Sequence, residues 1–147
     1  MVIDGKLKVK AKNGKIYDTN ITRLKSYKTL QTLSMNHHGL EKYSFALIED
    51  IQPKKISGPV FTLTVTNHLD QVRTFTASPD TQVYITGKKW SGFVNLDKLR
   101  KNAILVDYED RPNRILEIEK TDVEDVEGFD IKVMYTGNFF YNGILVR

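Results

Sequence analysis

Cysteine is absent from the 147 residues of this chain. The chain can therefore form no disulfide and no thiolate–metal site, and it has no cysteine nucleophile. Histidine is scarce: His37 and His38 are adjacent and His68 stands alone, whereas a zinc site needs three or four ligands at suitable spacing. We therefore expect the histidines to lie on surface loops, and we expect no metal and no cofactor.

Long apolar runs are also missing. No run approaches the length needed to span a membrane, and the N-terminal segment Met-Val-Ile-Asp-Gly-Lys has no apolar signal-peptide core. These absences predict a cytoplasmic protein with no membrane partner. The length favours a single domain over residues 1–147, which can bury a core without disulfides or metals.

The formal net charge of +4 is distributed unevenly, with acidic residues gathered in 107–127 and lysines in 6–28. A basic segment can attract phosphate groups, so nucleic acid is one candidate partner. The alternation of lysine with apolar residues follows a strand period, however, and this favours the solvated face of an amphipathic strand. The lysines that would contact nucleic acid are Lys6, Lys8, Lys10, Lys12 and Lys15.

Most of the chain alternates with the two-residue period of a β-strand. Asn13-Gly14 separates two such runs, and this dipeptide favours the turn of a hairpin. A second hairpin is expected over 61–77. Further strands are expected at 16–21, 43–48, 83–86, 103–106, 114–120, 128–134 and 138–146, an exposed turn at 34–39, a helical turn at 94–99, and either a short helix or a loop at 25–33. Many short strands with frequent turns predict an all-β domain.

The most informative segment is the C-terminal run Gly-Phe-Asp-Ile-Lys-Val-Met-Tyr-Thr-Gly-Asn-Phe-Phe-Tyr-Asn-Gly-Ile-Leu-Val-Arg, residues 128–147. A strand that contains Asp130 is followed by an aromatic strand, an Asn-Gly turn and three apolar residues. This order resembles the end of the hedgehog- and intein-type autoprocessing domains, the Hint family. The resemblance implies a Hint-like (intein-like) fold, a pseudo-symmetric β horseshoe of short strands and hairpins.

Two further segments resemble the same family. Residues 5–14 are similar to its first hairpin, which places Val2 near the position of the family's nucleophilic cysteine or serine. Residues 76–84 are similar to the box in which the family carries Thr-x-x-His or Ser-x-x-His. Here Ser78 holds the hydroxyl position, and Thr81 replaces the histidine that would activate the first scissile peptide.

The same comparison assigns roles to three positions near the C-terminus. Asp130 stands where many inteins carry a catalytic or structural aspartate. Gly137 stands in place of a histidine, and Arg147 stands in place of the penultimate histidine, with no terminal asparagine after it. The family's chemistry needs a nucleophile to form an ester, a histidine to protonate the scissile amide, and an asparagine to cyclise.

The resemblance therefore implies a degenerate Hint domain whose cleavage is lost, so we expect no enzyme activity. It suggests a structural or protein-interaction module that binds a protein partner or self-assembles. Such a module would be of phage or prophage origin, and then a virion component. Two alternatives stay open: a nucleic-acid-binding protein that uses the basic N-terminal hairpin, and a residual autoprocessing protein that uses Ser78 and Asp130.

Three other features have a structural and a functional interpretation. Asp107, Glu109 and Asp110 could bind a cation, but the Arg-Pro turn signal that follows favours solvated, partly paired charges. Ser78 begins a Ser-Pro-Asp turn, in which a serine hydroxyl typically caps backbone groups. Trp90 is expected to be exposed, and it is our candidate anchor for a protein partner.

Overall fold

The computed structural model describes residues 1–24, 27–36 and 42–147. These residues form one 12-stranded sheet and three 3-10 helices. The strands are β1 (Val2–Ile3), β2 (Lys6–Lys10), β3 (Ile16–Asn20), β4 (Gln31–Met35), β5 (Tyr43–Thr66), β6 (Val72–Ala77), β7 (Gln82–Thr86), β8 (Gly92–Asn95), β9 (Ile104–Val106), β10 (Pro112–Val133), β11 (Phe139–Tyr141) and β12 (Ile144–Val146); the 3-10 helices are η1 (Ile21–Arg23), η2 (Tyr27–Thr29) and η3 (Leu96–Lys98). The all-β prediction is confirmed.

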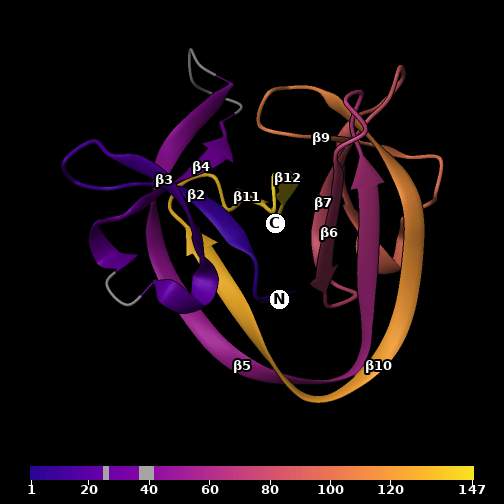
Figure 1. Cartoon of the computed structure of the whole chain (residues 1–147), viewed down its shortest axis with the longest axis horizontal. Coiled ribbons are helices and arrows are strands. Elements are labelled where there is room, and N and C mark those ends of the chain that lie inside the picture. The colour runs from indigo at the N-terminus through magenta and orange to yellow at the C-terminus, as the bar shows by residue number, and fades with distance from the viewer. Residues whose placement is uncertain (25–26, 37–41) are drawn as a thin grey trace.

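Two long antiparallel strands, β5 and β10, form the frame of a horseshoe (Figure 1). Midway along the pair, the register shifts between Val123 and Val126, beside Gly58 with φ 105° and Asp125 with φ 50°. A bulge of this kind bends and twists a strand pair, which explains how the two strands curve from one lobe into the other. The predicted horseshoe is therefore present.

The prediction of short strands was wrong for this frame. β5 has 24 residues and β10 has 22. The segments 114–120 and 128–134, expected as separate strands, are both parts of β10, together with the acidic run between them. The charged side chains of that run are exposed, so the outer face of one strand can hold them without a break in the pairing.

The two lobes are built from hairpins that branch from this frame. β2, β3 and β4 lie in one lobe, and β6, β7 and β9 lie in the other (Figure 1). The predicted Asn13-Gly14 hairpin joins β2 to β3, with Gly14 at φ 87°. The second predicted hairpin is the end of β5 with β6.

Three smaller expectations needed correction or refinement. Segment 25–33 contains η2 and the start of β4, with residues 25–26 outside the described residues. Ser34 and Met35, expected in an exposed turn, are the buried end of β4, because they pair with β5. Segment 94–99 holds the end of β8 followed by the single helical turn η3.

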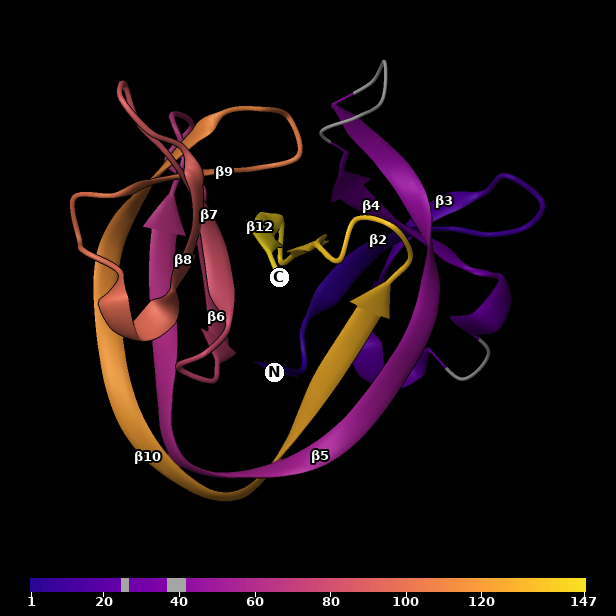
Figure 2. The same cartoon turned by 180° about the vertical axis from the view of Figure 1, so that it is seen from behind.

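The C-terminal hairpin β11–β12 lies between the lobes and connects them. Tyr141 of β11 pairs with Leu7 of β2, while Val146 of β12 pairs with Val83 of β7. Seen from behind, both chain ends lie in the space that the horseshoe encloses (Figure 2). All six residues of the two strands are buried, so this hairpin is also the centre of the core. No helix in the described part of the chain is long and apolar enough to cross a membrane.

Candidate functional site

The backbone of Met1 lies between two hydroxyl groups of the predicted box. Its amine donates hydrogen bonds to Ser78 Oγ and Thr81 Oγ1, each at 3.0 Å. Its carbonyl oxygen accepts from the Ser78 N–H at 2.9 Å and from Thr81 Oγ1 at 3.0 Å. The structure thus brings together the two box residues that the sequence singled out, and it places the first residue of the chain against them.

Val2, which the resemblance places near the nucleophile position, is the next residue along the chain, and that assignment stays a prediction. Val2 pairs with Ala77 of β6 and Phe129 of β10, and its side chain is buried. The Val2 side chain therefore belongs to the core, whereas the box bonds the backbone amine and carbonyl of Met1.

Two carboxylates border this cluster. Ser78 Oγ donates to Asp80 Oδ1 at 2.5 Å, and it also lies 3.1 Å from Thr81 Oγ1. Asp130 Oδ1 lies 3.8 Å from the Met1 amine, and its other oxygen lies 2.9 Å from Lys54 Nζ. The Ser78 hydroxyl therefore donates to the Asp80 carboxylate, which the turn brings back toward it. It also accepts from the backbone amine of Met1, so it bonds a backbone group as expected.

The hydrogen bond from Ser78 lowers the pKa of Asp80 below its ordinary value of 3.8, because the bond favours the charged form. We expect a carboxyl-carbon NMR titration to place the Asp80 midpoint below 3.8. In Ser78→Ala the midpoint should rise toward that value. The stability that this bond contributes is present above pH 3.8 and is lost as the pH falls through the lowered pKa.

A matched control for this titration is Thr62→Ala, which removes a hydroxyl from the Thr62–Thr76 contact, a pair that makes no bond with Asp80. It should leave the Asp80 midpoint unchanged. A Ser78→Ala midpoint equal to that of the wild-type chain would show that the Ser78–Asp80 hydrogen bond is not formed in solution.

Arg147 lies directly beside the box. Its N–H donates to the Gln82 carbonyl and its carbonyl accepts from the Gln82 N–H, each at 2.9 Å, while Nε donates to Gln82 Oε1 at 2.7 Å. The guanidinium stacks over Phe93, 4.3 Å from the ring centroid. Gly137 is instead an exposed turn residue with φ 67°, whose N–H donates to the Val133 carbonyl. The structure thus brings Arg147, but not Gly137, to the box.

The chemistry available around Met1 is hydrogen bonding without an imidazole. Within the described residues, the side chains that are hydrogen-bonded or ion-paired to its amine are Ser78, Thr81 and Asp130. His68 lies in the β5–β6 turn, and the predicted surface pair at 37 and 38 lies outside the described residues. The same described ranges contain no cluster of three acidic or histidine side chains that could hold a metal ion.

The basic face predicted for residues 6–15 is present on β2. Lys6, Lys8 and Lys10 share one side of the strand, because Leu7 and Val9 are fully buried on the other. Lys8 Nζ also forms an ion pair with Asp18 at 3.3 Å, and Lys10 Nζ lies 5.7 Å from the Phe45 ring centroid. Two of these lysines therefore have partners within the chain. Nucleic-acid binding would also use Lys12 and Lys15 at the hairpin tip, and it stays a prediction.

Trp90 lies in the turn between β7 and β8, and 57% of its surface is exposed, as expected. Its ring covers Gly92, where an added Cβ would lie 2.9 Å from the ring atom Cη2. This contact fixes the ring on the surface. Its role as an anchor for a protein partner stays a prediction.

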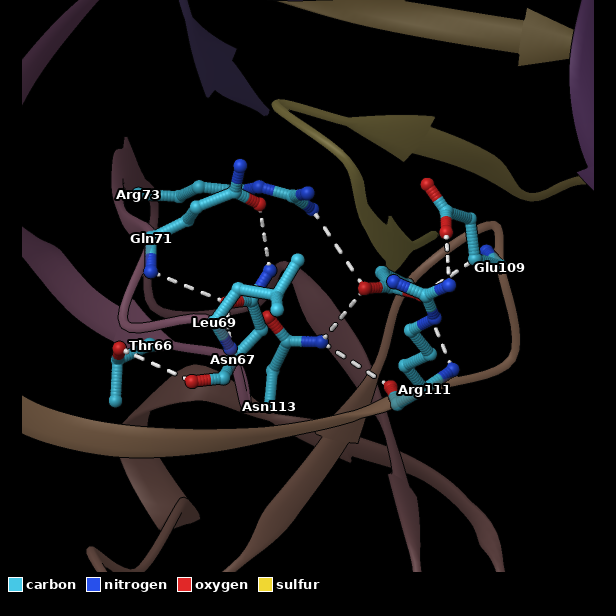
Figure 3. A network of polar contacts seen from close by, with 9 residues as sticks. Thr66, Asn67, Leu69, Gln71, Arg73, Glu109, Arg111 and Asn113 are labelled. Carbon is cyan, nitrogen blue, oxygen red and sulfur yellow. Dashed lines mark hydrogen bonds and ion pairs between the residues drawn. The ribbon is translucent and has the colours of Figure 1, made fainter.

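The acidic group at 107–110 is not uniformly solvated, and for Asp107 that expectation was wrong. Asp107 is 1% exposed. Its Oδ1 accepts from the N–H groups of Glu109 and Arg111, at 2.9 and 3.1 Å, and its Oδ2 accepts from Asn113 Nδ2 at 3.1 Å (Figure 3). Glu109 forms an ion pair with Arg111 on the surface, at 3.1 Å. Asp110 accepts a hydrogen bond from Lys42 at 2.8 Å, and this bond lowers the pKa of Asp110.

The neighbouring hairpin repeats this arrangement at Asn67. Its Oδ1 accepts from the N–H groups of Leu69 and Gln71, two and four residues later, as Asp107 does in its own turn (Figure 3). Asp70 and Asp110 then occupy equivalent left-handed positions, with φ 57° and 59°. A sequence signal for both was available, since Asx residues commonly bond the backbone two residues on, and aspartate tolerates this conformation.

Comparison with known proteins shows which fold this chain has. No family model and no curated protein matches the sequence. Among solved structures, the chain is similar to a bacterial intein-like domain from Clostridium thermocellum, with a TM-score of 0.76 and 17% identity over 99% of this chain and 96% of that chain. It is also similar to the transcription factor IIB Mvu mini-intein, with a TM-score of 0.74 and 15% identity over 100% of this chain and 99% of that chain. A third similar structure is a DnaB intein from Synechocystis sp. PCC 6803, with a TM-score of 0.68 and 24% identity over 99% of this chain and 96% of that chain. The whole chain therefore has the Hint fold of inteins and intein-like domains.

Proposed function

We propose that this chain is an intein-like domain that does not cleave peptide bonds and serves as a structural or protein-interaction module. The observation that supports this function is the side-chain set around Met1. Splicing chemistry needs a thiol or hydroxyl side chain beside this box, and neither the thioether of Met1 nor the side chain of Val2 can form the ester. Thr81, which holds the Met1 amine, cannot deliver a proton to a leaving amide at neutral pH as an imidazolium can.

The two hydroxyls that remain are also poorly suited to attack. Ser78 Oγ donates to Asp80 and Thr81 Oγ1 donates to the Met1 carbonyl. Both accept from the Met1 amine, so both are held within the cluster. A serine nucleophile needs a base that can take its proton at working pH. Asp80 is a weak base, because its pKa is lowered by this same bond. The site as a whole binds backbone and fixes β1 in the sheet.

The experiment joins a folded domain to each end of the chain and follows the mass of the fusion protein over several days at neutral pH with added thiol. We expect it to stay intact. A splicing-competent intein between the same two domains serves as the positive control. Appearance of fragments cut beside Met1 or Arg147 would overturn the proposal, and loss of those fragments in Ser78→Ala would then identify the nucleophile.

The interaction role is tested with the same protein by affinity capture from its native source, with and without nuclease. A discrete protein that survives nuclease and is lost with Trp90→Ala supports a module that docks through this exposed ring. Capture that disappears with nuclease would contradict the protein-interaction role.

A further inference from the structure

A groove of about 570 Å³ lies between the two lobes, apart from the cluster around Met1. Its walls come from β2, from β6 and from the turn that holds Tyr108, and its floor comes from the β11–β12 turn, Asn142-Gly143. The volume falls in the range of small-ligand sites, about 300–1,000 Å³. The groove is therefore large enough for a ligand the size of a mononucleotide.

Asn142 fixes the distance between the two walls. Its Oδ1 accepts from the Lys6 N–H at 2.7 Å, and its Nδ2 donates to the Thr74 carbonyl at 2.8 Å. The residue has φ 49°, and Gly143 after it has φ 83°, as an Asn-Gly hairpin turn requires. Since one side chain is bonded to both walls, the groove is formed before any ligand arrives.

Positive charge dominates the lining. Lys6, Lys8 and Arg73 supply three cations, and Asp18 is the one lining carboxylate, so the lining carries a formal charge of +2. Asp18 is paired with Lys8 at 3.3 Å. Lys6 is exposed, and it makes no ion pair with any residue that the structure describes. Arg73 has the Asp107 carboxylate 4.0 Å away, so Lys6 is the lining cation without an ion-pair partner among the described residues, and the groove favours an anionic ligand.

Arg73 brings unused hydrogen-bond donors to the same groove. Its Nη1 is buried and has no hydrogen-bond partner, and the Asp107 Oδ2 atom lies 4.0 Å away (Figure 3). Gly143 supports the guanidinium so closely that an added Cβ would lie 3.0 Å from Arg73 Cζ. Across the described residues, the guanidinium donates no hydrogen bond to the protein. Because Nη1 is buried, a ligand in the groove would meet the other N–H groups of this planar guanidinium, whose geometry suits an oxyanion.

We propose that this groove is a binding site for a phosphate monoester. The phosphate lies against Arg73 and Lys6, and the organic part lies along Tyr108 and the half-exposed Val72. A phosphate offers the three lining cations more negative charge and more acceptor oxygens than a carboxylate does. The proposal goes beyond the module function and is independent of it, because none of these residues contacts the Met1 cluster in the bonds described above.

The test is calorimetric titration of the full chain at low salt with inorganic phosphate, adenosine 5′-monophosphate and benzoate. We expect saturable one-to-one binding of phosphate, tighter binding of the nucleotide, and weaker binding of benzoate. Arg73→Gln should raise the Kd of the nucleotide by about tenfold or more, since a charge-assisted bidentate contact is lost. Lys6→Gln should also raise it, whereas Lys12→Gln, at the hairpin tip outside the groove, should not.

A second readout locates the site. Backbone amide shifts on nucleotide addition should be largest at Thr74 and Gly143, which line the groove. If Arg73→Gln does not fold, as judged by its circular dichroism, Lys6→Gln carries the test, because Lys6 is an exposed side chain. Absence of saturation, equal losses in Lys6→Gln and Lys12→Gln, or benzoate binding as tight as phosphate would overturn the proposal. Oligonucleotide binding that depends on Lys12 but not on Arg73 would also overturn it, in favour of a nucleic-acid surface.

Discussion

Replacing Asp107 with alanine is expected to lower the free energy of unfolding by about 3–5 kcal/mol, the cost of breaking a buried charged network. The carboxylate is 1% exposed and accepts bonds from Glu109 N–H, Arg111 N–H and Asn113 Nδ2. It is also the carboxylate that faces the buried Nη1 of Arg73, at 4.0 Å. Alanine would leave both a turn without its acceptor and a cation without its counter-ion.

Urea denaturation followed by circular dichroism measures this loss. Asp107→Asn keeps an acceptor for the two turn N–H groups but removes the charge, so it should fall between the wild-type chain and Asp107→Ala. Glu109→Ala is the surface control, because its ion pair with Arg111 is exposed and should contribute less than about 1 kcal/mol. A loss in Asp107→Ala no larger than in Glu109→Ala would contradict the network.

Replacing Asn138 with alanine is expected to lower the free energy of unfolding by about 2–4 kcal/mol, because buried backbone groups lose their partners. The Asn138 side chain is buried between β10 and β11. Its Oδ1 accepts from the Met35 N–H at 2.7 Å, and its Nδ2 donates to the Met35 carbonyl at 3.0 Å and the Thr136 carbonyl at 3.3 Å. Alanine would leave both backbone groups of Met35 without these bonds inside the protein.

The same denaturation experiment tests this prediction, and hydrogen exchange localises it. The Met35 amide should exchange much faster in Asn138→Ala than in the wild-type chain. Asn13→Ala provides the comparison, since Asn13 is exposed and its side chain accepts one bond, from the Lys15 N–H at 3.0 Å; its effect should stay below about 1 kcal/mol. Equal effects of the two substitutions would show that the Asn138 bonds are not formed in solution.

Local turn chemistry made much of the fold predictable. Asn13-Gly14 and Asn142-Gly143 both form hairpin turns, since Asn142, Gly143 and Gly14 adopt the positive φ that these turns require. The full length of strand β10 was harder to predict, because the acidic residues in its middle resemble a surface loop when the partner strand is unknown. What holds that middle in the sheet is pairing with β5, a contact between segments far apart in the sequence.

The candidate site, like the fold, could be predicted from the sequence only in part. The sequence marked Ser78 and Thr81, and the structure brings both to the start of the chain. It could not show that the backbone of Met1 bonds these two hydroxyls, because the contact joins segments 77 and 80 residues apart. Nor could it reveal the contact of Arg73 with Asp107, which arises only when strand β6 packs against the turn after β9.

The position of hairpin β11–β12 also has a consequence for how the chain acquires its structure. β11 pairs with β2, and β12 pairs with β7, so the segment that bridges the lobes is synthesised after every strand that it joins. Non-local pairing of this kind makes folding slow, because a large loop must close before the contact stabilises it. During synthesis, the apolar inner face of each lobe therefore stays exposed to solvent until residues 139–146 have been synthesised and have paired. A nascent chain stalled before Phe139 would present that face to chaperones, and release of the last strands would commit it to the folded horseshoe.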